Sequence, residues 1–216
     1  MDDLGHGRAL ICYFSFSNQT HRIVQTIEEV LNGLGVTCVK ERLRPVAPLE
    51  FPVNSIPRTL RLMLKTLFRW RVAIHPLSGH ALEREFDAVV LAGPTWSYNP
   101  SGPILSLMDQ YGGLIFRRRI VIPVISCRSY WKAHFNCLKA RITGFGGTIT
   151  PPVVLKHPLA EPWKTLGVFL TVAGKNPRRL PVLRARYTQY GHTRKQLEAA
   201  REDVRRLWSE YVRETA

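Results

Sequence analysis

Apolar residues follow two alternating patterns along the chain. Short apolar runs typical of buried strands cover 8–14, 36–40, 86–93 and 119–126, and 146–155 predicts a turn and a fifth strand interrupted by prolines. Between and after them, apolar residues at intervals of three and four predict helices over 20–34, 58–74, 131–142 and 193–211, with another beginning near 104. Pro123 predicts an irregularity in the fourth strand because proline lacks a ladder donor. Strands alternating with helices predict an α/β fold with a doubly wound parallel sheet and helices on both faces.

The segment 15–20, with the sequence SFSNQT, joins the first predicted strand to the first helix. A strand, a loop and a helix in that order aim the unpaired N–H groups of the first helical turn at the loop, which favours an anion. Ser15, Ser17 and Thr20 add hydroxyls that can donate to phosphate oxygens, and Asn18 tolerates a left-handed backbone. The alternative is that Ser17 or Asn18 merely caps the helix.

Two further loops follow buried strands and carry side chains suited to a planar ligand. The segment 94–103 sets Trp96 and Tyr98 among Gly, Pro and Ser, and a stiff loop of this kind presents ring faces. The alternative is a proline-rich turn in which the Trp96 side chain packs into the hydrophobic core. Cys127 and Arg128 follow the fourth strand, and we interpret Cys127 as an ordinary loop cysteine rather than a nucleophile. Because ligands of open α/β sheets bind beyond the carboxyl ends of the strands, the three loops are expected to converge.

These motifs resemble those of a known family. The segment 15–20 resembles the T/S-x-T/S-G-x-T phosphate loop of flavodoxins and flavodoxin-like oxidoreductases, with Asn18 in place of the usual Gly. The segments WSYNPSGP and VISCRSYW, with the long carboxyl-terminal extension, are similar to flavodoxin-type proteins described as dialkylresorcinol-condensing-enzyme-like, over roughly residues 8–175. The resemblance implies a flavodoxin-like five-stranded sheet of order 2-1-3-4-5 with FMN as cofactor.

The resemblance also implies which residues contact FMN. The phosphate would be held by Ser15, Ser17, Asn18, Gln19 and Thr20, the ring would be lined by Pro94, Thr95, Trp96, Ser97 and Tyr98, and the far side would be closed by Ser126, Cys127, Arg128 and Ser129. Tyr98 and Arg128 are the candidate catalytic residues, since a guanidinium near the pyrimidine edge of the flavin could stabilise charge on the reduced ring. No metal is expected.

The leading functional hypothesis is an FMN-dependent oxidoreductase that takes a hydride from NAD(P)H and passes it to a quinone-like or other apolar aromatic acceptor. A first alternative is a non-enzymatic, membrane-surface or partner-binding protein with a degenerate FMN site, suggested by Asn18 and by the basic helix described next. A second is a tailoring or condensing role on a lipid-like aromatic, although the sequence offers no Cys and His arrangement typical of carbon–carbon bond formation.

A basic amphipathic helix is predicted over about 57–76. Arg58, Arg61, Lys65 and Arg69 recur at intervals of three and four, and Leu, Met and Phe fill much of the remainder. An ordinary helix covering the sheet, a lid over an apolar substrate and an in-plane membrane contact all fit this pattern.

Composition narrows the class of protein. The 31 Lys+Arg against 16 Asp+Glu give a net charge of +15, which favours an anionic membrane surface or nucleotide cofactor as partner. Nucleic acid is disfavoured because no recognition motif is present. Four cysteines without metal-like spacing and no membrane-spanning apolar stretch predict a cytoplasmic protein, peripheral at the membrane at most.

The length fits one domain, 1–216, whose carboxyl-terminal extension, 156–216, ends in a helix. Thr193 and Gln196 form a capping box at the start of that helix. The segment 162–186 has no clear period, and it is expected to complete a substrate pocket or a homodimer contact.

Overall fold

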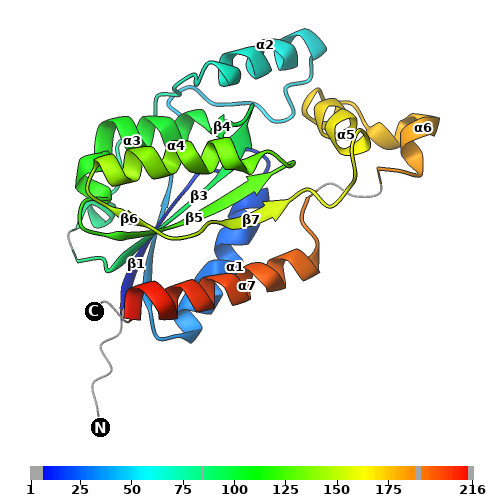
Figure 1. The fold of residues 1–216 in the computed structure, drawn as a ribbon. Coiled ribbons are helices and arrows are strands. Elements are labelled where there is room, and N and C mark those ends of the chain that lie inside the picture. Colours follow the sequence, from blue (N-terminus) through cyan, green and yellow to red (C-terminus); the bar gives the residue numbers. More distant parts are fainter. Residues whose placement is uncertain (1–6, 84, 188–190, 214–216) are drawn as a thin grey trace.

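The computed structural model describes residues 7–83, 85–187 and 191–213, and it shows a central sheet between two layers of helices (Figure 1). The strands are β1 (Arg8–Tyr13), β2 (Thr37–Arg42), β3 (Ala88–Trp96), β4 (Asn99–Pro100), β5 (Ile120–Cys127), β6 (Thr148–Ile149) and β7 (Val153–Lys156). The helices are α1 (Gln19–Gly33), α2 (Ile56–Leu67), α3 (Gly102–Ile115), α4 (Trp131–Gly144), α5 (Trp163–Val172), α6 (Pro181–Arg184) and α7 (Arg194–Leu207). Short 3₁₀ turns cover Gly79–Leu82 and Pro177–Arg179, and a π-helical turn, Trp208–Arg213, continues α7.

The parallel strands lie in the order β2-β1-β3-β5, and β6 and β7 share the position beside β5. The predicted flavodoxin-like order 2-1-3-4-5 is confirmed. The fifth strand, predicted over 146–155 with an interruption by prolines, is divided into β6 and β7 because Pro151 and Pro152 cannot donate to the ladder. In addition, β4 pairs antiparallel with the end of β3 and forms a hairpin that the sequence did not predict.

Pro123 lies inside β5 without interrupting it. The register with β3 continues through the proline, which lies opposite Leu91, so the predicted irregularity of this strand was wrong. Val121 pairs with Ile149 of β6 and Val124 with Val153 of β7, so the break between β6 and β7 falls beside Pro123. The irregularity therefore appears in the neighbouring strand rather than in β5 itself.

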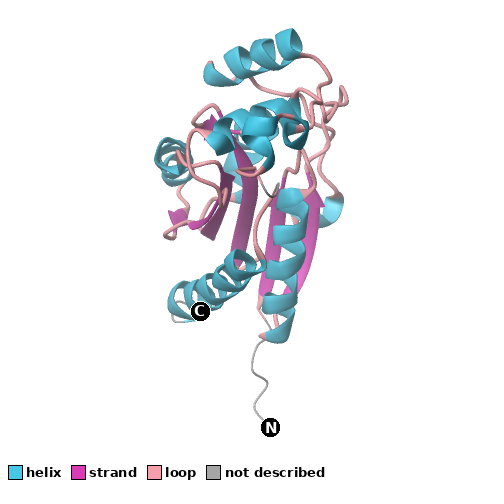
Figure 2. Cartoon of the chain, turned by 90° about the vertical axis from the view of Figure 1, so that its right-hand side faces the viewer, coloured by secondary structure: helices cyan, strands magenta, loops and turns pink. Residues whose placement is uncertain are grey.

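Helices α1 and α7 cover one face of the sheet and α3 and α4 cover the other (Figures 1 and 2). Side chains of β1 alternate between the layers, as expected for a strand buried on both faces. Ala9, Ile11 and Tyr13 pack with α1 and α7, while Leu10 and Cys12 pack with α3 and α4. The predicted capping box of α7 is confirmed. None of the helices among the described residues is long and apolar enough to cross a bilayer.

The basic helix predicted over 57–76 is shorter than expected, because α2 ends at Leu67. The Nδ2 group of Asn99 donates to the carbonyls of Thr66 and Leu67, at 3.2 and 3.1 Å, and so caps the end of the helix. Arg69 then takes a left-handed φ of 54°, which an α-helix does not allow. The following residues run extended beside 44–46, with His75 N donating to Arg44 O at 2.8 Å. Figure 1 shows α2, α5 and α6 lying outside both helical layers.

Candidate functional site

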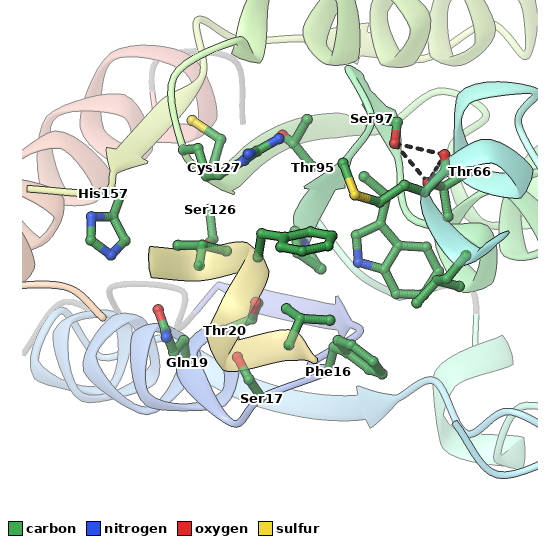
Figure 3. A pocket seen from close by; sticks show the side chains of 18 of the residues that line it. Phe16, Ser17, Gln19, Thr20, Thr66, Thr95, Ser97, Ser126, Cys127 and His157 are labelled. Carbon is green, nitrogen blue, oxygen red and sulfur yellow. Dashed lines mark hydrogen bonds between the residues drawn. The ribbon is translucent and has the colours of Figure 1, made fainter. Parts of the chain in front are cut away.

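A cavity of about 180 Å³ opens beyond the carboxyl ends of β1, β3 and β5. Figure 3 shows Ser17, Gln19 and Thr20 on one side of it and Thr66, Thr95 and Ser97 on the opposite side. The lining residues are Phe16, Ser17, Gln19, Thr20, Thr59, Leu62, Met63, Thr66, Pro94, Thr95, Trp96, Ser97, Ser126, Cys127, Arg128, His157, Val168, Phe169, Val172 and His192. The three loops singled out from the sequence therefore meet at one cavity, as expected for the switch point of a doubly wound sheet.

Ten of the predicted cofactor contacts line this cavity. They are Ser17, Gln19, Thr20, Pro94, Thr95, Trp96, Ser97, Ser126, Cys127 and Arg128. The structure thus brings them together, while their role as cofactor contacts stays a prediction.

The backbone at Asn18 has the conformation that glycine would adopt most readily. Asn18 is the N-cap residue of α1, with φ 59° and ψ 0°, and its side chain makes no capping hydrogen bond. Asn is one of the few residues that enter the left-handed region routinely. The hydroxyl of Ser15 accepts a hydrogen bond from His21 N at 3.2 Å instead. Asn18 therefore occupies the N-cap position expected in the capping alternative, but the hydroxyl that bonds to the first turn of the helix belongs to Ser15 rather than to Ser17 or Asn18.

The start of α1 offers a set of backbone donors. Among the described residues, the N–H groups of Ser17, Asn18, Gln19 and Thr20 have no acceptor, whereas His21 N is bonded to Ser15. Unpaired N–H groups at a helix start, aided by the helix dipole, favour an anion. Because Ser17, Gln19 and Thr20 also line the cavity, the donors lie at its edge.

The second loop begins later than predicted, because β3 continues through Pro94 and Thr95 to Trp96. Ser97 and Tyr98 then form the two-residue turn of a β-hairpin, both with positive φ, at 42° and 73°. The Trp96 ring meets Phe14 and Phe16 edge-on, with centroids 5.5 and 5.6 Å apart. Trp96 therefore packs on the core and forms a cavity wall at once.

Hydrogen bonds fix the hydroxyls of this hairpin. Thr95 Oγ1 lies 2.8 Å from Nδ1 of His134, which is 1% exposed. Burial lowers the pKa of His134 to about 3, so the imidazole is neutral near pH 7. On the other side of the hairpin, Ser97 Oγ lies 2.8 Å from Thr66 Oγ1 and donates to Met63 O at 3.0 Å. Ser97 thereby connects the sheet to α2.

The third loop supplies the cationic group of the cavity. Arg128 is the one Lys or Arg among the described lining residues, and that lining contains no carboxylate. Burial lowers the pKa values of His157 and His192 to about 4, so both are neutral near pH 7. Burial raises the pKa of Cys127 to about 11, which keeps the thiol protonated and agrees with its interpretation as an ordinary cysteine.

Four predicted site residues do not line the cavity. Ser15 is buried with its hydroxyl bonded to His21 N, and Asn18 is exposed at the turn. Tyr98, a candidate catalytic residue, lies at the hairpin tip with 49% of its surface exposed, and its ring centroid is 5.1 Å from that of Tyr130. Ser129 accepts a hydrogen bond from Lys164 Nζ. Tyr98 was expected at the cavity because the hairpin, which turns its side chain outward, was not predicted.

The sequence also left half of the lining unassigned. The missed residues are Phe16, Thr59, Leu62, Met63, Thr66, His157, Val168, Phe169, Val172 and His192. Their signal was present in part, since the α2 residues recur at helical spacing and 162–186 was expected to complete a pocket. Nothing in the sequence indicated that His157 and His192 would lie together with Ser126, whose Oγ is 2.8 Å from His192 Nε2. The described residues contain no group of three or more His, Cys, Asp or Glu side chains that could bind a metal.

No protein-family model matches the sequence, and no curated protein matches it. Solved structures do resemble it. A Lactobacillus acidophilus flavoprotein in complex with FMN is 16% identical, with a TM-score of 0.52 over 68% of this chain and 91% of its own. A flavodoxin from the domain Archaea is 13% identical, with a TM-score of 0.52 over 94% and 97%. A Bacteroides eggerthii protein proposed to be a flavoprotein is 17% identical, with a TM-score of 0.56 over 78% and 99%. These likenesses establish the flavodoxin-like fold.

Proposed function

We propose that the cavity binds FMN and that the protein is an oxidoreductase that takes reducing equivalents from NAD(P)H and reduces a quinone-like or other apolar aromatic acceptor. The observation that carries the proposal is the loop 15–20, whose unpaired N–H groups lie at the edge of a cavity with an aromatic wall. The Lactobacillus flavoprotein of the same fold, which was solved with FMN, supports the choice of cofactor.

The residues at the start of α1 suit the phosphate of FMN. The N–H groups of Ser17 to Thr20 have no acceptor among the described residues, and the hydroxyls of Ser17 and Thr20 add two donors. No carboxylate of the described lining would repel the phosphate. Since Asn18 already has the left-handed backbone for which glycine is preferred, its presence does not by itself make the loop degenerate.

The walls of the cavity suit the flavin ring. Phe16 and Trp96 present aromatic surface, and Thr95 is held in place by His134. When bound, FMN would accept a hydride and release two electrons to an acceptor. Arg128 would offset negative charge at the pyrimidine edge of the ring, which is the function we assign to it.

The opposite wall favours an apolar second substrate. Leu62 and Met63 of α2 and Val168 and Phe169 of α5 line the cavity, and Arg128 is the one Lys, Arg, Asp or Glu of its described lining. The two helices would exclude water from the ring and admit an aromatic acceptor after the nicotinamide has left. The condensing alternative gains no support, because the Cys127 thiol stays protonated at neutral pH.

A flavin titration of the purified full chain tests the proposal. We expect FMN to bind with a shifted absorbance spectrum and quenched fluorescence, and riboflavin, which lacks the phosphate, to bind at least about tenfold more weakly. Anaerobic addition of NADH or NADPH should then bleach the bound flavin, and a short-chain quinone should restore the colour. Absence of FMN binding would overturn the whole proposal. Binding without bleaching by either nucleotide would retain FMN and reject NAD(P)H.

A further inference from the structure

Helix α2 exposes apolar side chains on the face that points away from the cavity. Together with the residue that follows the helix they form what we call the outer stripe, which consists of Ile56, Leu60, Leu64, Leu67 and Phe68. Leu64 is 60% exposed and Phe68 is 80% exposed. Twelve large apolar residues are exposed in the part of the chain that the structure describes, and five of them belong to this stripe. Such a cluster on one helix differs from the scattered apolar residues of an ordinary surface.

Positive charge lies along one edge of the outer stripe. An α-helix turns by 100° per residue, which places Arg58, Arg61 and Lys65 around the helix axis next to Phe68. They therefore border the edge of the outer stripe that is opposite Ile56. No ion pair of the described residues uses any of these three cations. The segment 51–82 contains five Lys and Arg and no Asp or Glu. An apolar stripe with an unopposed basic edge is typical of helices that lie in a membrane interface.

A second basic segment adjoins the first. Residues 162–187, which include α5 and α6, contain six Lys and Arg and no Asp or Glu. Val53 N, just before α2, donates to Val172 O at the end of α5 at 2.7 Å, and Figure 1 shows the two helices as neighbours. Positive charge is thus concentrated in the two segments that form the helical wall of the cavity.

We propose that the outer stripe and its basic edge dock onto an anionic lipid bilayer. The apolar side chains would enter the boundary between headgroups and acyl chains, and the Arg and Lys side chains would meet lipid phosphates. Charge complementarity favours a bilayer over a second copy, because two chains of charge +15 repel each other. Docking does not depend on a flavin. Its consequence, that an apolar acceptor reaches the cavity from the bilayer past α2, rests on the proposed function.

Vesicle flotation of the full chain tests the docking. We expect the protein to float with phosphatidylcholine vesicles that contain phosphatidylglycerol, to stay behind with phosphatidylcholine alone, and to be released by salt. The double variant Leu64→Glu/Phe68→Glu should lose at least about tenfold in vesicle affinity. Arg58→Gln/Arg61→Gln should lose roughly fivefold for each cation removed. Leu114→Glu, at a site on α3 that is 41% exposed, is the matched control and should float like the parent.

The outcomes separate docking from the flavin chemistry. None of the four substituted positions, which are Arg58, Arg61 and Leu64 of α2 and Phe68 just after it, lines the cavity. FMN titration of each variant should therefore match the parent and report intact folding. If Leu64→Glu/Phe68→Glu does not fold, the vesicle affinity of Arg58→Gln/Arg61→Gln tests the docking proposal. Docking would be overturned if the variants floated as well as the parent, or if the parent floated equally well with neutral vesicles. It would also be overturned if the outer stripe mediated dimerisation and the protein did not float. Loss of FMN binding in the parent would overturn the proposed function and leave the flotation result standing.

Discussion

The two sides of the cavity are held in place by different means. The sheet side consists of segments that continue from buried strands or lead into α1, namely 17–20, 94–97 and 126–128. Helix α1 itself buries seven side chains. On the helical side, α2 buries only Thr59 and Thr66, and the hydroxyls of both bond back to carbonyls of their own segment. The sheet side is therefore anchored by the core, whereas α2 depends on its contacts with the hairpin and α5.

Because of this difference, cofactor binding and acceptor entry are expected to depend on different sides of the cavity. Local opening is expected where few apolar side chains are buried, so α2 should open more easily than α1. A cofactor held on the sheet side would meet a geometry that exists before binding, which is how phosphate and ring would be oriented. An acceptor that enters along α2 would meet a wall that can move. Each prediction below tests one side against the other.

The largest effect is expected from the phosphate loop. The double variant Ser17→Ala/Thr20→Val removes two hydroxyl donors to a charged group, each worth about 1.5 kcal/mol or more, so FMN affinity should fall by about 100-fold. Riboflavin affinity should stay the same, because riboflavin has no phosphate. Fluorescence titration measures both constants.

The matched control for the phosphate loop lies on the other wall. Thr59→Val replaces a cavity-lining threonine of α2 by a residue of the same shape, and it should change FMN affinity by less than about threefold. If Thr59→Val weakened FMN as much as the loop variant did, the phosphate would have to be held by both sides, and the division of roles would be wrong.

Asn99 is the residue on which the attachment of α2 depends most. Replacing it by Ala leaves the carbonyls of Thr66 and Leu67 without their donor, at a cost of about 2 kcal/mol. Hydrogen exchange of the α2 amides should then accelerate by roughly 30-fold, while that of the α1 amides stays constant. The exposed Asn136→Ala on α4 is the control and should change neither helix. Equal acceleration in α1 would mean that Asn99 supports the whole fold rather than α2.

The sequence predicted the sheet side far better than the helical side, for a physical reason. Strand β1 and helix α1 are adjacent in the chain, and the loop between them is determined by residues within a few positions of one another. The residue type of Asn18 was also compatible with the left-handed backbone that the structure shows. The order of the sheet followed from buried apolar runs and from the phosphate-loop resemblance. Short-range pattern was sufficient for this half of the cavity.

The helical side depends on contacts between distant segments, which no local pattern contains. The end of α2 is set by Asn99, more than thirty residues away, so the helix was predicted too long. Tyr98 was placed at the cavity because the turn that points it outward arises from pairing between β3 and β4. His192 reaches Ser126 across 66 positions of sequence. Periodicity shows which face of a helix is apolar, but it does not show what that face meets.

His134 of α4, which holds Thr95 of the sheet side, should contribute to acid sensitivity. The pKa of His134 is lowered from 6.5 to about 3 in the folded chain, so the unfolded chain takes up a proton first. Stability from this residue is complete above about pH 6.5 and is lost as the pH falls toward 3, with a loss of about 2 kcal/mol at pH 5. Urea unfolding of His134→Gln should show a loss between pH 8 and pH 5 that is smaller by about this amount. The exposed His75→Gln should leave the loss unchanged, and an unchanged loss in His134→Gln would contradict the assignment.

The smallest effect is expected at Asn18, where it decides whether the phosphate loop is sound. Asn18→Gly keeps the left-handed backbone, so FMN affinity should change by less than about threefold. Asn18→Val places a β-branched side chain at φ 59°, at a cost of about 1–2 kcal/mol, and should weaken FMN by about tenfold. Titration of the pair tests the backbone conformation rather than side-chain chemistry, because position 18 is not part of the cavity lining. A gain far above threefold in Asn18→Gly would mean that Asn18 itself impairs the loop, and the degenerate-site alternative would then be favoured over a working reductase.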